Sequence, residues 1–135
     1  MKVAATISRY LLGLIFLVFG LNGFLHFIPQ PPPPSPLALQ FMMAMSASHY
    51  FVLVFLVQLI GGILLLVNRF VPLALTILAP VILNILNFHL LMNPGGMGPG
   101  ILATILWIVV FLSVRTSFYG ILQARAVPVE TSPRA

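Results

Sequence analysis

The sequence predicts an all-α integral membrane protein, an antiparallel four-helix bundle with both chain termini in the cytoplasm. The chain has 135 residues, of which 61% are hydrophobic and 5% are charged, whereas about a quarter of the residues in a soluble domain are charged. Continuous apolar runs reach the length of about 18 residues that is typical of a membrane-spanning helix. Positive charges fall on alternate connections between these runs, as expected for a multi-pass protein.

The apolar runs define a transmembrane domain over residues 1–120. The first run has a basic start, as a secretory signal does, but it is long for a signal and lacks a convincing cleavage site, so we expect a retained helix. Residues 121–135 are polar and small, which predicts a cytoplasmic tail with little fixed structure. The four predicted spans are Tyr10–Ile28, Tyr50–Val67, Val71–Met92 and Ile101–Tyr119.

The first connection combines an extended segment with a short helix. "PQPPPPSP", residues 29–36, is expected to form a stiff polyproline II segment. The following "LALQFMMAMSASHY" is partly apolar, which favours a short extra helix on the membrane surface or across the end of the bundle. Between the second and third runs only "NRF" intervenes, so these two helices must form a tight hairpin.

Small residues within the runs predict where helices approach one another. Glycines at a helix interface let two backbones come close together, and a proline inside a helix removes one hydrogen bond and bends the helix. The predicted packing positions are Gly13, Gly20, Gly23, Gly61, Gly62 and Pro80.

The distribution of positive charge predicts the orientation of the chain. Connections 29–49 and 93–100 contain no Lys or Arg. Because cytoplasmic loops retain positive charge, these two connections are expected on the non-cytoplasmic side of the membrane, which in bacteria is the periplasmic side. The formal charge of +5 therefore indicates membrane topology rather than a nucleic-acid partner. The expected partners are the lipid bilayer and either other membrane subunits or further copies of the chain. The residues that carry the topology signal are Lys2, Arg9, Arg69 and Arg115.

Several kinds of chemistry are disfavoured by what the sequence lacks. There is no cysteine, which excludes disulfides, thiol relays, iron–sulfur clusters and zinc–thiolate sites. The single acidic residue, Glu130, lies in the tail, and proton or cation pumps usually depend on carboxylates inside their spans. No nucleophile with a base–carboxylate partner is evident, so we expect no catalytic residues and no independent activity.

A group of polar residues interrupts the apolar runs on the predicted periplasmic side. Polar side chains in a span are costly and usually face protein or water, so we expect them to converge inside the bundle, with Gln58 as the floor of the site. His89 lies two residues after Asn87 and therefore points about 200° away from it, toward a different neighbour. The candidate site residues are Asn22, His26, Gln58, Asn84, Asn87 and His89.

Three interpretations of this group remain open. The amides and imidazoles can form hydrogen bonds between helices, worth about 0.6 kcal/mol each on average. They can instead bind the two carbonyls of a quinone headgroup. A third interpretation is haem or metal ligation through His26 and His89, which both lie near the outer ends of their helices.

Three segments, "RYLLGLIFLVFGLNGFLHFIP", "GGILLLVNRFVPLAL" and "APVILNILNFHLLMNPGG", resemble the DoxX family of small bacterial four-helix membrane proteins. The resemblance covers about residues 8–119, and "NGFLH" and the Asn–Arg link are its most distinctive parts. It implies a membrane redox setting, because the family name comes from a protein associated with a terminal quinol oxidase and related proteins are linked to thiosulfate:quinone oxidoreductase.

The expected function is therefore an accessory or quinone-contacting subunit of a respiratory complex. A fold family does not transfer a reaction, so alternatives remain. One is a structural or assembly subunit that docks a larger membrane complex without a ligand. A haem-binding or small-solute membrane protein is the third.

Overall fold

The computed structural model describes residues 1–129, and this part of the chain is helical with no β-strand. The predicted all-α class is confirmed. Residues 130–135, which include Glu130 and the end of the predicted tail, lie outside the described residues. The helices are α1 (Lys2–Leu25), α2 (Pro36–Ala47), α3 (Tyr50–Leu66), α4 (Val71–Leu91) and α5 (Gly98–Val114), with short 3₁₀ turns η1 (Pro94–Gly96) and η2 (Arg115–Phe118).

Two of the helices begin or end at other residues than the apolar runs predict. α1 begins at Lys2, well before Tyr10, because the intervening segment contains good helix formers that hydropathy alone does not count. It ends at Leu25, and His26 adopts a left-handed conformation with φ of 52°. α5 begins at Gly98 rather than Ile101, since Pro99 fits the first turn of a helix.

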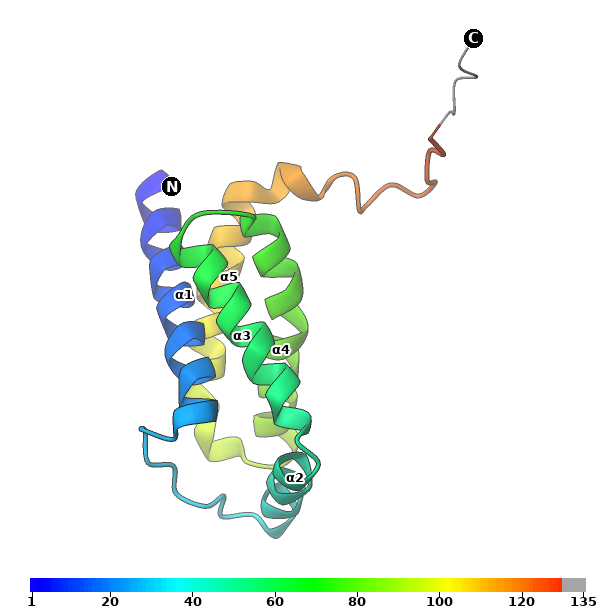
Figure 1. Cartoon of the computed structure of the whole chain (residues 1–135). Coiled ribbons are helices and arrows are strands. Elements are labelled where there is room, and N and C mark those ends of the chain that lie inside the picture. Colours follow the sequence, from blue (N-terminus) through cyan, green and yellow to red (C-terminus); the bar gives the residue numbers. More distant parts are fainter. Residues whose placement is uncertain (130–135) are drawn as a thin grey trace.

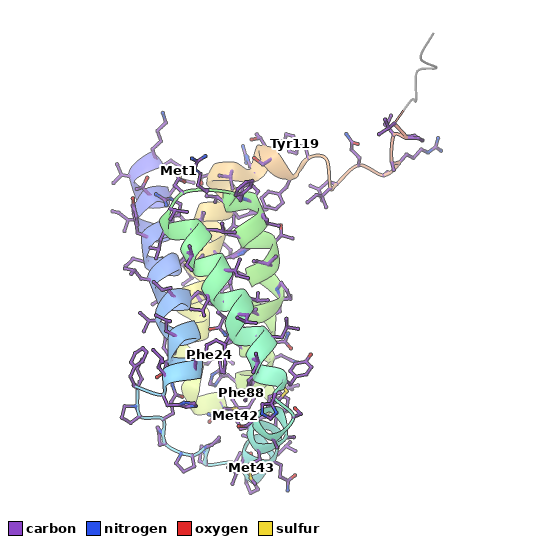
Figure 2. The ribbon with its side chains drawn as sticks, in the orientation of Figure 1. Met1, Phe24, Met42, Met43, Phe88 and Tyr119 are labelled. Carbon is purple, nitrogen blue, oxygen red and sulfur yellow. The ribbon has the colours of Figure 1, made fainter. Side chains whose placement is uncertain are left out.

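The four long helices lie side by side and run in alternating directions (Figure 1). α1 packs against α3 and α5, and α4 packs against the same two helices. The start of α1, the α3–α4 link and the end of α5 lie at one end of the molecule, and α2 lies at the other (Figure 1). Figure 2 shows Met1 and Tyr119 at the first of these ends and Met42, Met43 and Phe88 at the second.

Three segments within residues 1–129 are long and apolar enough to cross a membrane: α1, α4, and α5 together with η2. α3 becomes a fourth when it is joined to α2, from which it is bent by 84°. α3 alone has 17 residues, which is the lower limit of about 17–25 residues for a transmembrane helix. Several long apolar helices therefore indicate a multi-pass membrane protein.

The short helix expected after the proline-rich segment is present as α2. Ser35 caps it by accepting a hydrogen bond from the Ala38 N–H at 3.4 Å, and Pro36 occupies the first turn. Phe41 of α2 packs on Phe88 of α4 with ring centroids 5.5 Å apart. Because Ala38 is also buried, α2 is held against the end of the bundle by its apolar residues.

Close packing between α1 and α3 depends on two facing glycines. A methyl group added at Gly62 would lie 2.8 Å from the Leu17 nitrogen and 2.9 Å from the Gly13 carbonyl oxygen. Only hydrogen atoms therefore fit between these two backbones. The apolar core continues from this contact toward α4 and α5, and its most deeply buried large residues are Phe16, Leu12, Leu65, Leu75, Leu78 and Val110.

Candidate functional site

Asn22 is buried at the end of α1, where it closes the helix. Its side chain is 8% exposed, and its Oδ1 accepts a hydrogen bond from the Ile28 N–H at 2.6 Å. The Asn22 carbonyl also accepts from the His26 N–H at 2.9 Å. The bond to His26 is the last regular bond of the helix, whereas the side-chain bond to Ile28 holds the segment that leaves it. The sequence prediction that Asn22 lies inside the bundle agrees with this burial, and the geometry gives it a structural role.

Gln58 is the second buried amide, on the inner face of α3. It is 7% exposed, and no hydrogen bond of its side chain occurs within residues 1–129. Gly20 of α1 contacts Leu59, and Gly23 contacts Phe55, so Gln58 lies at about the height of Asn22 in the bundle. Within residues 1–129 no buried side-chain nitrogen or oxygen lacks a hydrogen-bond partner, so an amide atom of Gln58 that makes no such bond is not fully buried.

His26 lies outside the bundle, so its expected place in an interior cluster is wrong. The expectation assumed that α1 continues through residue 26, which would put His26 on the same face as Asn22, four positions earlier. The helix instead ends at Leu25, and His26 is an exposed residue in the left-handed region, where the chain turns away. The side chain therefore no longer follows the face of the helix.

His89 is half-buried and belongs to the turn between α4 and α5. Its Nδ1 lies 3.0 Å from the Asn93 carbonyl oxygen, and because a carbonyl only accepts, Nδ1 must be the protonated nitrogen. The ring also packs edge-on against Phe88, with centroids 5.2 Å apart, and leaves no room for a side chain at Gly96. These contacts hold the end of α4 to the following turn.

Metal ligation gains no geometric support from these histidines. His26 is exposed at the end of α1, whereas His89 is engaged with its own turn. Within residues 1–129 there is no group of three or more His, Cys, Asp or Glu side chains that could hold a metal ion. Haem or metal binding through His26 and His89 stays an untested prediction.

Asn84 and Asn87 lie on the outer face of α4, so the expectation that they point into the bundle is also wrong. Both are exposed. The Nδ2 of Asn84 donates to the Pro80 carbonyl at 2.8 Å, and Asn87 makes no side-chain hydrogen bond with the described part of the chain. The buried face of α4 includes Leu78, and Asn87 follows nine residues later, about 180° around the helix.

Together with Leu83, the residues Pro80, Asn84 and Asn87 line a shallow, open hollow in the surface of α4. Another shallow and open hollow lies near the N-terminus, between Lys2 and Ile7. Neither opens toward the buried amides Asn22 and Gln58. The six candidate residues are therefore divided among the bundle interior, two turns and one outer helix face.

Arg9 is a buried residue whose structural contacts the sequence analysis missed. It is 9% exposed and donates hydrogen bonds to the carbonyls of Leu65 and Leu66 at the end of α3. Its guanidinium also lies 4.3 Å from the centroid of the Tyr10 ring. The last carbonyls of a helix lack intrahelical partners and attract cations. The sequence offered one signal for this contact. Arg9 lies in the part of the first helix that is level with the short "NRF" link, where α3 ends.

Comparisons with known proteins give no match: no family model, no curated protein and no solved structure is similar to this chain. The resemblance to the DoxX family therefore stays an expectation from the sequence, and the function has to be inferred from the geometry of the chain itself.

Proposed function

We propose that this protein is a multi-pass subunit of a membrane assembly in the bacterial inner membrane, without a catalytic centre of its own. In this proposal α1, α3, α4 and α5 each cross the bilayer as an antiparallel bundle with both termini in the cytoplasm. The charges support this orientation. Lys2 and Arg9 in α1, Arg69 in the α3–α4 link and Arg115 after α5 belong to segments at one end of the bundle (Figure 1).

The observation that carries the proposal is the outward position of Asn84 and Asn87. An amide moved from water to an apolar medium without a hydrogen-bond partner costs about 2–7 kcal/mol. Polar side chains in a span therefore usually face protein or water rather than lipid. These two amides lie in the C-terminal half of α4, toward the end of the bundle where α2 lies and away from the charged end (Figure 1). A protein neighbour is the simplest way to satisfy them.

A second candidate function is contact with a quinone headgroup, and Gln58 is the observation that favours it. The residue is 7% exposed, and no hydrogen bond of its amide occurs within residues 1–129. A quinone carbonyl would accept a hydrogen bond from this amide. Such a ligand would have to enter between helices, because neither of the shallow surface hollows reaches Gln58.

The assembly role can be tested by purifying the tagged full-length chain from inner membranes in mild detergent. We expect the wild type to migrate in a complex larger than one chain on native gels. The double variant Asn84→Leu/Asn87→Leu should migrate mainly as a single chain. The matched control Leu102→Ala changes an exposed residue on α5 and should leave the complex intact. A wild type that migrates only as a lone chain would refute the assembly role.

The same preparation tests the quinone candidate. Extracted lipids are analysed for quinone from the wild type, from Gln58→Leu and from the isosteric variant Gln58→Glu. Quinone that co-purifies with the wild type and is lost in Gln58→Leu would support headgroup contact. Equal quinone content in the wild type and Gln58→Leu would rule it out.

The topology can be tested by cysteine labelling, because the chain contains no native cysteine. Ser48→Cys, between α2 and α3, should react with a membrane-impermeant maleimide from the periplasmic side. Ser117→Cys, in η2, should react only after the inner membrane is permeabilised. The reverse pattern would place the termini outside.

A further inference from the structure

The outer face of α4 bears a stripe that contains three polar side chains, and we define it as Thr76, Pro80, Asn84 and Asn87. These residues follow one another at spacings of four, four and three, so they share one side of the helix. All four are exposed. Outward-facing residues elsewhere on the long helices are largely apolar, for example Leu14, Val18, Leu53, Ile60, Ile105 and Ile108.

The polar groups of the stripe are only partly satisfied within the chain. The Thr76 hydroxyl donates to the Pro72 carbonyl at 2.8 Å, and one N–H of Asn84 donates to the Pro80 carbonyl at 2.8 Å. The second N–H and the carbonyl oxygen of the Asn84 amide are left, and so is the whole amide of Asn87. Pro80 also has no N–H, which frees the Thr76 carbonyl from its usual helical bond. The stripe therefore offers both donors and acceptors.

Resting on the assembly role proposed above, we infer that the neighbour on this stripe is a second copy of the same chain. An amide contains both a donor and an acceptor, so an asparagine is its own hydrogen-bonding complement. The stripe contains no charged residue and calls for no charged partner. A second copy supplies the complementary amide at each position without any further requirement on its sequence.

The orientation of the chain fixes the symmetry of this pair. All copies insert with the same charged end in the cytoplasm, so the two-fold axis of a closed dimer must run along the membrane normal. In such a dimer, each residue on the axis faces its own counterpart at the same depth. Asn84 then lies opposite Asn84, and Asn87 opposite Asn87. The shallow hollow lined by Pro80, Leu83, Asn84 and Asn87 lies along this line.

The dimer can be detected by single-cysteine cross-linking in the otherwise cysteine-free chain. Leu83→Cys lies within the hollow, and Ile105→Cys lies on the outer face of α5 as a matched control; the native residues are 66% and 55% exposed. The purified protein is reconstituted in vesicles of phosphatidylethanolamine and phosphatidylglycerol, and copper–phenanthroline oxidises two thiols to a disulfide. We expect a covalent dimer with Leu83→Cys and little with Ile105→Cys.

The contribution of the amides is measured on the Leu83→Cys background. Adding Asn84→Leu and Asn87→Leu should weaken dimerisation at least about tenfold, because the interhelical hydrogen bonds of both amides are lost. Asn84→Gln with Asn87→Gln keeps both amides and should retain most of the dimer. Dilution with lipid gives the change in dimerisation constant, and circular dichroism checks that each variant is folded.

The outcomes separate this inference from the assembly role. No cross-link at Leu83→Cys, equal yields at the two cysteines, or a dimer that is unchanged by the leucine substitutions would overturn the self-association. A benzophenone maleimide attached to Leu83→Cys also detects a neighbour that has no cysteine. If this probe cross-links only to a different protein in native membranes, the assembly role stands and the second copy is wrong. If it gives no cross-link in the purified protein or in native membranes, both proposals fail.

Discussion

The α1–α3 interface finds its packing and hydrogen-bond partners within the chain, whereas the outer face of α4 does not. Lipid tails are as apolar as leucine, so helices in a membrane associate through close packing and satisfied polar groups rather than through the hydrophobic effect. α1 and α3 meet these conditions within one chain, through Gly13 and Gly62 and through the hydrogen bonds of Arg9. The stripe on α4 has unpaired amides instead, and the neighbour that we propose for it lies outside the chain.

The largest effect is expected where the α1–α3 interface has no spare room. Gly62→Val would bring a side chain within 2.8 Å of the Leu17 nitrogen and 2.9 Å of the Gly13 carbonyl oxygen. Overpacking usually costs about 1–3 kcal/mol, and contact with backbone atoms puts this variant at the upper end or above it. Unfolding in increasing SDS, followed by circular dichroism, should show most of the stability lost.

The control for this prediction is Gly95→Ala, at a glycine of the α4–α5 turn. An added methyl group there meets no atom within 4 Å, and no described glycine has a positive φ. Its unfolding curve should match that of the wild type. If Gly62→Val unfolds at the same SDS fraction as Gly95→Ala, the tight packing between α1 and α3 does not stabilise the fold.

Arg9→Met should give the next largest effect. The substitution keeps an unbranched apolar stem but removes the donors to the Leu65 and Leu66 carbonyls. Because hydrogen bonds to charged groups contribute about 1.5–3 kcal/mol, a loss of about 2 kcal/mol is expected in SDS unfolding. Lys2→Met removes an exposed positive charge from the same helix and should change stability by no more than about 0.5 kcal/mol. Equal losses in the two variants would contradict a specific role of Arg9 at the end of α3.

The inner side of α4 provides a smaller test. The Trp107 Nε1–H donates to the Leu75 carbonyl at 2.9 Å and so joins α5 to α4. Trp107→Phe removes this bond but leaves an aromatic ring beside Phe111, which lies 5.1 Å from Trp107 between centroids. We expect a loss of about 1 kcal/mol, measured by circular dichroism in SDS. The outward variant Ile108→Leu should be neutral, and a neutral Trp107→Phe would mean that the bond adds nothing to the α4–α5 contact.

The class of the protein and the course of its chain could be predicted because they depend on long features of the sequence. The length of an apolar run predicts a helix, a proline-rich segment separates two of them, and "NRF" is too short for anything but a hairpin. The short helix α2 followed from the spacing of its apolar residues and is present at Pro36–Ala47.

The direction in which each polar side chain points could not be predicted in the same way. In a soluble helix the polar face marks the outside, but every face of α4 is mainly apolar, so the only guide was the rule that polar groups avoid lipid. That rule does not distinguish a neighbouring helix of the same chain from a neighbour outside the chain, and it placed Asn84 and Asn87 inside. His26 was misplaced for a local reason, since its direction depends on where α1 ends.

The smallest effect is expected for Asn87→Leu, and Asn22→Leu, the same substitution at a buried position, is its comparison. Asn22→Leu removes the hydrogen bond from the Ile28 N–H at 2.6 Å and should cost about 1–2 kcal/mol, because it leaves a partly buried donor without its partner. Asn87→Leu removes an exposed amide that bonds to nothing within the described chain, so the dilute protein in detergent should change by less than about 0.5 kcal/mol. Both are measured by SDS unfolding at a concentration where the wild type is a single chain. If Asn87→Leu destabilises the single chain as much as Asn22→Leu does, Asn87 already has a partner within the fold, and the stripe on α4 needs no second molecule.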